Sequence, residues 1–188
     1  KSVSVAVTQF SGVTASIPVS SNITCSGQCN GGATALASGG TSPYIYSWSN
    51  GQTTVNSSGL CAASYKVTIT DANSCSSSTT VVITQPTALV TSDTGTGISC
   101  NGGTNASATV SAGGGTTPYS YQWSSGQTGS TASGLTAGNY TITVTDANGC
   151  KSTQSISITQ PTALNAATTN SAVTCNGSNN GNASVSGS

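Results

Sequence analysis

Apolar and polar residues alternate with a period of two along most of this chain. Tyr, Tyr and Trp occupy every second position of 119–123, and Tyr, Ile and Val do so in 140–144. Successive side chains of a β-strand point to opposite faces, so this pattern predicts strands with one face in a core and one in solvent. Helical periodicity is absent from the sequence. We therefore predict an all-β fold.

Stretches rich in Gly, Asn and Ser separate the alternating segments at the spacing of a small all-β domain. This spacing predicts an immunoglobulin-like or PKD-like β-sandwich of about seven short strands. Small residues such as Ala106, Ala108 and Ala112 are expected to face inward, which makes the core thin and weighted towards aromatics. Strands are predicted near 88–99, 106–112, 119–124, 130–134, 139–145 and 152–159. The predicted core aromatics are Tyr44, Tyr46, Trp48, Tyr65, Tyr119, Tyr121, Trp123 and Tyr140.

The whole pattern recurs after 75 residues without a gap, as the series Cys25, Cys100 and Cys175 illustrates. Such recurrence predicts tandem repeats stacked end to end. We expect residues 11–85 to form repeat one, 86–160 repeat two, 1–10 the last strand of a preceding repeat and 161–188 the start of a third. The Gln85-Pro86 and Gln160-Pro161 steps are the predicted junctions. Both ends fall inside a repeat, so we expect a window of a longer array.

Composition excludes most kinds of chemistry. The chain has no His, Arg, Glu or Met, and only three Lys and three Asp. Side chains that move protons or bind metals are scarce, so we expect neither an enzyme nor a metal or other cofactor. The net charge is zero, which offers no basic patch for nucleic acid or an anionic membrane. The longest apolar runs are only a few residues long, so membrane insertion is not expected.

Abundant Ser, Thr, Gly and Asn also fit a disordered chain, but the alternation and the aromatic residues favour folded β-structure. Five of the seven cysteines recur at the repeat period and the chain has no His, which favours disulfides over zinc and predicts an extracellular protein. Cys29 and Cys61 occur together in repeat one, where repeat two has Thr104 and Thr136. We expect these two cysteines to bond to each other.

Two pairings remain open for the other cysteines. Cys25 is expected near the lower end of its sandwich, and Cys75 and Cys150 at the upper end, roughly 25 Å away. One hypothesis is a bond between repeats, Cys25 to Cys150, with Cys75, Cys100 and Cys175 losing partners to truncation. The alternative keeps bonds within repeats, Cys25 to Cys75 and Cys100 to Cys150, if the first strand is short. The first pairing predicts a stiff rod, and the second predicts beads on Gln-Pro hinges.

Two further groups of residues have a functional and a structural interpretation. Asp71 with Asn73, and Asp146 with Asn148, offer oxygen ligands to Ca²⁺, or they form Asx-type turns. A single carboxylate per repeat favours the turn. The aromatics of 44–48 and 119–123 offer a platform for sugar stacking, or they pack in the core, which we favour.

The sequence resembles a known repeat. The runs PYSYQWSSG at 118–126, GLTAGNY at 134–140 and TDANGC at 145–150 are similar to the SprB-type repeat. Repeats of this kind occur in very large cell-surface adhesins of gliding Bacteroidota, which the type IX secretion system exports. The resemblance covers essentially the whole sequence, although repeat one differs by Ser74, Cys29 and Cys61.

The resemblance implies a role in surface attachment and gliding motility. We predict a structural segment, a stalk or filament, whose partners are neighbouring repeats of the same chain. The alternative hypothesis makes the repeats themselves a binding surface for polysaccharide or solid substratum, with weak contacts multiplied by copy number.

Overall fold

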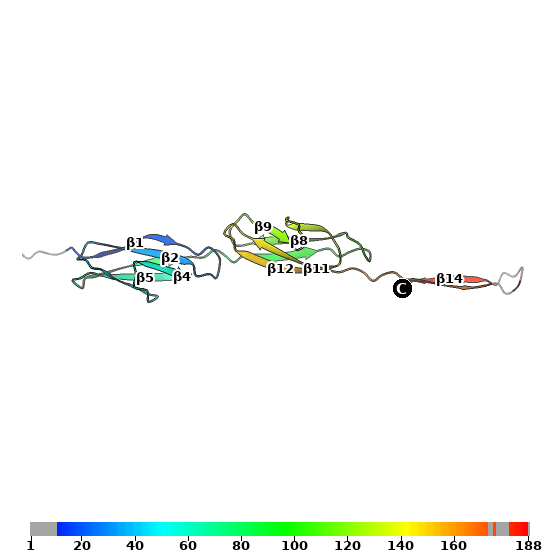
Figure 1. Ribbon diagram of the computed structural model, residues 1–188, viewed down its shortest axis with the longest axis horizontal. Helices are drawn as coiled ribbons and strands as arrows, with labels where there is room; N and C mark the ends of the chain where they lie inside the picture. The colour runs from blue at the N-terminus through cyan, green and yellow to red at the C-terminus, as the bar shows by residue number, and fades with distance from the viewer. Residues whose placement is uncertain (1–10, 173–174, 176–180, 188) are drawn as a thin grey trace, which may run out of the picture. The chain divides into compact units, whose positions relative to one another are not determined.

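The computed structural model describes residues 11–172, 175 and 181–187 (Figure 1). The strand predicted at 1–10 lies outside these residues. Every regular element in the described part is a β-strand, which confirms the all-β prediction. Among the described residues, no helix is long and apolar enough to span a membrane. The chain divides into two compact units: Lys1–Val90 with Gly113–Tyr119 and Thr145–Lys151, and Thr91–Ala112 with Ser120–Val144 and Ser152–Ser188.

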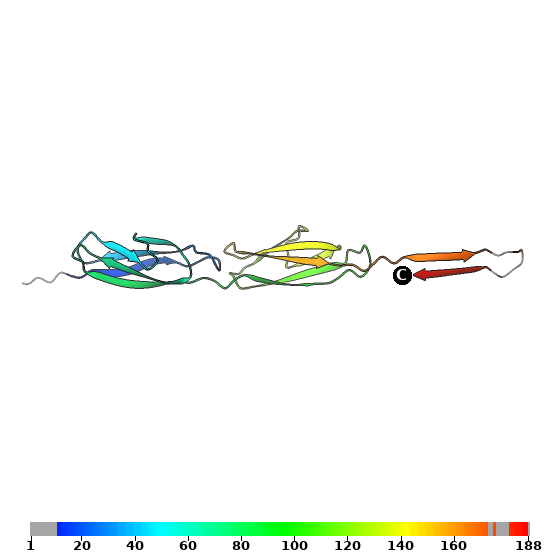
Figure 2. The same cartoon turned by 90° about the horizontal axis from the view of Figure 1, so that it is seen from below.

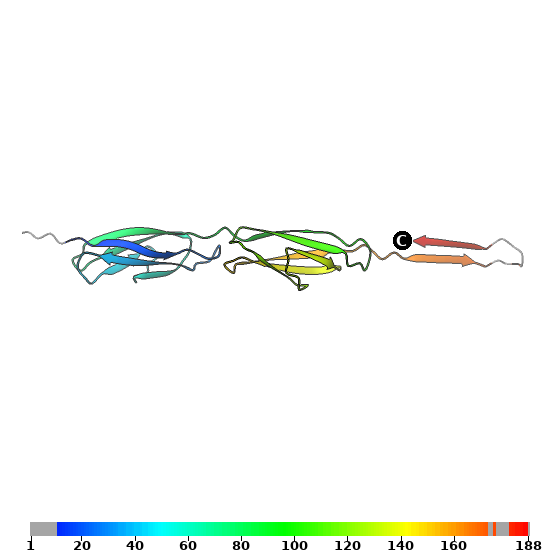
Figure 3. The same ribbon diagram turned by 90° about the horizontal axis from the view of Figure 1, so that it is seen from above.

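Two antiparallel sheets form the first β-sandwich (Figures 1 and 3). One sheet has the order β1 (Thr14–Ser21), β2 (Gly31–Ser38), β4 (Asn56–Leu60), and the other has β3 (Ile45–Trp48), β5 (Ala63–Thr70), β6 (Ser76–Ile83). The two sheets bury a shared core that includes Ala35, Leu60, Trp48, Val67 and Ile69. This is the sheet arrangement of an immunoglobulin-like sandwich in which one sheet lacks its fourth strand.

The second sandwich, green to yellow in Figure 2, has the same strand order as the first. Its sheets are β7 (Val90–Gly95), β8 (Ala106–Gly113), β10 (Thr131–Leu135) and β9 (Ser120–Trp123), β11 (Gly138–Thr145), β12 (Lys151–Ile158). Six strands form each sandwich instead of about seven. Only residues 124–130 join β9 to β10, and they begin with a turn in which Trp123 and Gln127 bond through their backbones. This link leaves no room for another strand.

The third repeat contributes an antiparallel hairpin of β13 (Ala166–Ser171) and β14 (Asn182–Gly187), orange and red in Figure 2. These strands occupy the positions that β1 and β2 hold in repeat one. The side chains of both strands are exposed, with Val185 at 71%. Ala183 and Val185 alternate with polar residues along β14, but both side chains are exposed.

The predicted core aromatics fall into two groups. Trp48 and Trp123 are buried, and each indole N–H donates a hydrogen bond to a backbone carbonyl, at 2.9 and 2.8 Å. The tyrosines are half-buried: Tyr44, Tyr46, Tyr65, Tyr119, Tyr121 and Tyr140. The Tyr140 hydroxyl donates to the Thr136 carbonyl four residues upstream, a tyrosine corner of the kind found in immunoglobulin-like domains.

We expect Ile142→Ala to destabilise the second sandwich by about 2 to 5 kcal/mol, because it leaves a cavity between the sheets. Thr141→Ala is the matched control, since its exposed side chain occupies the adjacent position of β11. Urea unfolding in a Trp48→Phe background, followed by Trp123 fluorescence, measures both changes. Equal losses from the two substitutions would contradict the inward orientation of Ile142.

Candidate functional site

The side chain of Asp146 organises the turn between β11 and β12. It is buried, with 5% of its surface exposed. Its Oδ1 accepts the backbone N–H groups of Asn148 and Cys150, at 2.9 and 2.8 Å. Its Oδ2 accepts the N–H of Thr116 at 2.9 Å, from the loop between β8 and β9. One carboxylate therefore holds two loops together and fixes the backbone of Cys150.

Asp71 forms the equivalent contacts in repeat one. It accepts the N–H groups of Thr41 and Asn73 at 3.0 Å each and that of Cys75 at 2.8 Å. The neighbouring Gly40 has a φ of +66°, and a Cβ there would lie 2.7 Å from the Asp71 carboxylate. Only glycine allows the loop to approach the carboxylate this closely.

Two opposing effects set the pKa of Asp146. Desolvation by burial raises it, but hydrogen bonds from the backbone of Thr116, Cys150, Asn148 and Gly149 outweigh this and lower the pKa below its ordinary value of 3.8. The carboxylate uses both oxygens as acceptors for N–H groups, which is the geometry of an Asx-type turn. Within the described residues, no three His, Cys, Asp or Glu side chains gather in a way that could hold a metal.

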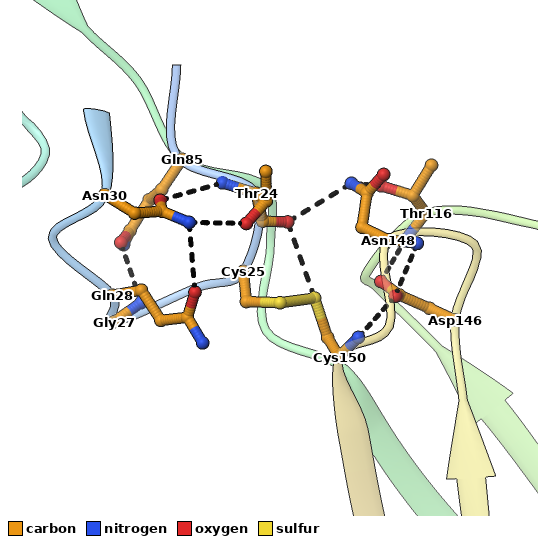
Figure 4. The surroundings of a disulfide bond; sticks show 10 residues. All are labelled: Thr24, Cys25, Gly27, Gln28, Asn30, Gln85, Thr116, Asp146, Asn148 and Cys150. Atoms are coloured by element: carbon orange, nitrogen blue, oxygen red, sulfur yellow. Dashed lines mark hydrogen bonds between the residues drawn. A yellow bond between two sulfur atoms is a disulfide. The ribbon is translucent and has the colours of Figure 1, made fainter. Parts of the chain in front are cut away.

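A second set of polar contacts shapes the loop that carries Cys25 (Figure 4). The N–H of Gly27 donates to Gln85 Oε1 at 2.9 Å, so the residue before the Gln-Pro junction holds the loop. The Asn30 side chain accepts the N–H of Thr24 at 3.2 Å and donates to its hydroxyl at 2.7 Å. These contacts fix the backbone on both sides of Cys25.

The two loops meet in a disulfide between Cys25 and Cys150, with the Cα atoms 5.6 Å apart (Figure 4). Asn148 Nδ2 donates to the Thr24 carbonyl oxygen at 3.2 Å, beside the bond. The Cys150 sulfur, which carries no proton in the disulfide, lies 3.4 Å from the same oxygen. All four residues belong to the first compact unit. An open pocket of about 370 Å³ borders the bond and is also lined by Leu89 and Lys151.

The structure places the other predicted disulfide cysteines as follows. Cys29 is bonded to Cys61, which joins the loop after β1 to the turn between β4 and β5. Cys75, Cys100 and Cys175 are exposed and form no disulfide. Cys25 therefore bonds to a cysteine of repeat two and not to Cys75 of its own repeat.

Sequence reasoning missed several residues of this site, although their recurrence could have identified them. Gln160 accepts the N–H of Gly102 at 2.8 Å, as Gln85 does for Gly27 in repeat one. Asn105 donates to the Ser99 hydroxyl at 3.0 Å, which matches the bond from Asn30 to Thr24. A polar residue that recurs in register within a turn is a signal of side chain to backbone bonding.

Comparison with known proteins gives one informative result. Residues 17–53 and 92–128 each match the family model described as the SprB repeat, which confirms the resemblance seen in the sequence. The two matches are offset by the repeat period. No curated protein matches the chain. A solved structure of the amphioxus IgVJ-C2 molecule is similar to this chain at 14% sequence identity and a TM-score of 0.33, and the match covers 78% of this chain and 99% of that one.

The lowered pKa of Asp146 predicts acid lability. A carboxyl group whose pKa is lower in the folded state stabilises the fold above its unfolded pKa, and the stabilisation disappears as pH falls through the folded value. We expect the urea midpoint of the wild-type chain to decline as pH falls from about 4 to 2, and Asp146→Asn to flatten this decline. Asp93→Asn, which alters a carboxyl that accepts a side-chain amide hydrogen bond from Gln154, is the charge-matched control. A decline of the same size in Asp146→Asn would exclude this role for Asp146.

The positions of Asp and Lys allow a decisive disulfide map. After thiol blocking and denaturation without reductant, cleavage before Asp71, Asp93 and Asp146 and after Lys66 and Lys151 separates Cys75, Cys100, Cys150 and Cys175 into different peptides. We expect mass spectrometry to find peptide 146–151 linked to the peptide that contains Cys25. A link from the Cys25 peptide to the Cys75 peptide, or from Cys100 to Cys150, would instead indicate bonds within repeats.

Proposed function

Because two segments of the chain match the SprB repeat, we propose that it is a structural segment of a large secreted cell-surface adhesin. It serves as a stalk or filament in surface attachment and gliding motility. The observation that carries the stalk interpretation is the bond between Cys25 of repeat one and Cys150 of repeat two. A covalent link from one repeat to the next suits a segment that transmits force, and such disulfides are typical of oxidising locations outside the cytoplasm.

The chemistry of the loops around the disulfide supports a structural role and not an enzymatic one. The carboxylates of Asp71 and Asp146 accept backbone N–H groups and are buried. The side chains of Gln85 and Asn30 hold the cysteine loop. No buried polar side-chain atom in the described part of the chain lacks a hydrogen-bond partner. The polar groups of the site are thus committed to holding its shape.

The exposed surface favours the stalk over a multivalent binding surface. Multivalency gains affinity from copies of one site, so the contact residues should recur in each repeat. Repeat one exposes Val19, Leu36, Ile45, Val55 and Val82, whereas repeat two has Thr94, Ser111, Ser120, Ser130 and Ser157 at the same positions. The features that recur are the core and the loop contacts, which are the features a scaffold needs.

Adhesion of beads that display many copies of the oxidised chain tests this proposal. We expect no retention on agar, glass or a panel of polysaccharides beyond that of beads carrying the reduced and alkylated chain. Retention that rises steeply with the density of displayed chains would support the multivalent alternative. In that case, Ile45→Ser and Val82→Ser, which introduce the residues of repeat two, would show whether the apolar side chains of repeat one are the contacts.

A further inference from the structure

The disulfide between Cys25 and Cys150 changes the covalent path through the chain. The two cysteines are 125 residues apart in sequence, but one bond joins their side chains. Strand β1 lies before Cys25, strand β12 begins directly after Cys150, and β2 to β11 lie between the two cysteines. Force applied outside the bonded pair therefore has a shorter route than the polypeptide backbone.

Hydrogen bonds fix the loops at both ends of this route. On one side, Gln85 and Asn30 fix the loop of Cys25. On the other side, Asp146 holds the backbone N–H of Cys150 at 2.8 Å. Asn148 adds a direct hydrogen bond between the loops, to the Thr24 carbonyl. These contacts fix the positions of the two cysteines, and the covalent bond between the sulfurs provides the path for the load.

We propose that the bond between Cys25 and Cys150 is a tension bypass, meaning that pulling force passes from β1 through the two sulfurs into β12. The backbone of residues 26–149 then carries no end-to-end load. The strands that build most of both cores cannot be extended while the disulfide is intact. This proposal depends on the proposed stalk function only for the premise that the chain experiences tension.

The second disulfide lies inside the bypassed segment and provides an internal test. Cys29 and Cys61 are 32 residues apart, and both fall between Cys25 and Cys150. If force takes the bypass, the bond between Cys29 and Cys61 has no effect on how far the chain extends. If force follows the backbone, the bond between Cys29 and Cys61 prevents the loop between these cysteines from extending. Loss of the bond then lengthens the extended chain.

The test is single-molecule extension of the full chain held by its two ends. Cys75→Ser, Cys100→Ser and Cys175→Ser in every sample prevent side reactions of the exposed thiols. Adding Cys25→Ser and Cys150→Ser should release roughly 300 Å more chain at about 3.5 Å per residue, since the loop closed by Cys29 and Cys61 stays hidden. Adding Cys29→Ser and Cys61→Ser should release nothing when the bypass is present, and roughly 100 Å when it is absent.

Two results would overturn the proposal. One is a bypass-containing chain that extends as far as the chain with Cys25→Ser and Cys150→Ser. The other is a longer extension upon Cys29→Ser and Cys61→Ser while the bypass is present. Tryptophan fluorescence of each variant confirms folding before extension. The readout is a length and not binding, so retention of beads in the adhesion assay would contradict the stalk function while leaving the bypass intact.

Discussion

The geometry of the loops depends on the hydrogen bonds of two buried aspartates. Asp71 accepts the backbone N–H of Cys75, and Asp146 accepts that of Cys150. A carboxylate has two oxygens that can each accept more than one hydrogen bond, whereas a neutral amide offers one such oxygen. Asp146 uses this capacity to bind the backbone of Thr116, Asn148 and Cys150 together. The partial positive charge of these N–H groups compensates for the burial of the negative charge. A single side chain thus orders two loops and presents the cysteine in a fixed position.

Such contacts matter because each sandwich has a thin core. Repeat one buries Ala33 and Ala35 on β2, and at Gly31 a Cβ would lie 2.6 Å from the side chain of Ile83. Small domains of this kind bury limited apolar area, so covalent bonds add a substantial share of stability, typically about 2 to 4 kcal/mol each. The core also accepts an exchange of larger and smaller side chains at constant total volume. Val67 and Ile69 of repeat one correspond to Ile142 and Val144 of repeat two.

The two repeats differ at exposed surface positions, whose side chains the proposed stalk function does not require. Exposed positions change from Val, Leu and Ile to Ser and Thr between repeats, while the buried tryptophan, the turn aspartate and the junction glutamine recur. The extra bond between Cys29 and Cys61 strengthens the loop of Cys25 in repeat one only. In repeat two, Thr136 occupies the position of Cys61 and hydrogen-bonds Tyr140. Within the described residues, no disulfide therefore holds the loop of Cys100.

Sequence by itself determined the strands, their inward faces and the period of the chain. These features are local, because alternation with a period of two follows from the geometry of one strand and the period from direct comparison of residues. Trp123, Ile142 and Val144 are buried at the positions that the alternation assigned to the core. The tyrosines were assigned to the core but are half-buried. The extent of their burial depends on neighbouring strands and loops, which the alternation within one strand does not show.

Only the tertiary structure decided which cysteines bond and what the polar turn residues do. Disulfide partners need Cα atoms a few ångströms apart, and the separation of residues as distant as Cys25 and Cys150 depends on the whole fold between them. The sequence therefore left two pairings open. It also could not show that Gln85 reaches Gly27 or that Asp146 reaches Thr116. These bonds join segments that are far apart along the chain and close together only after folding.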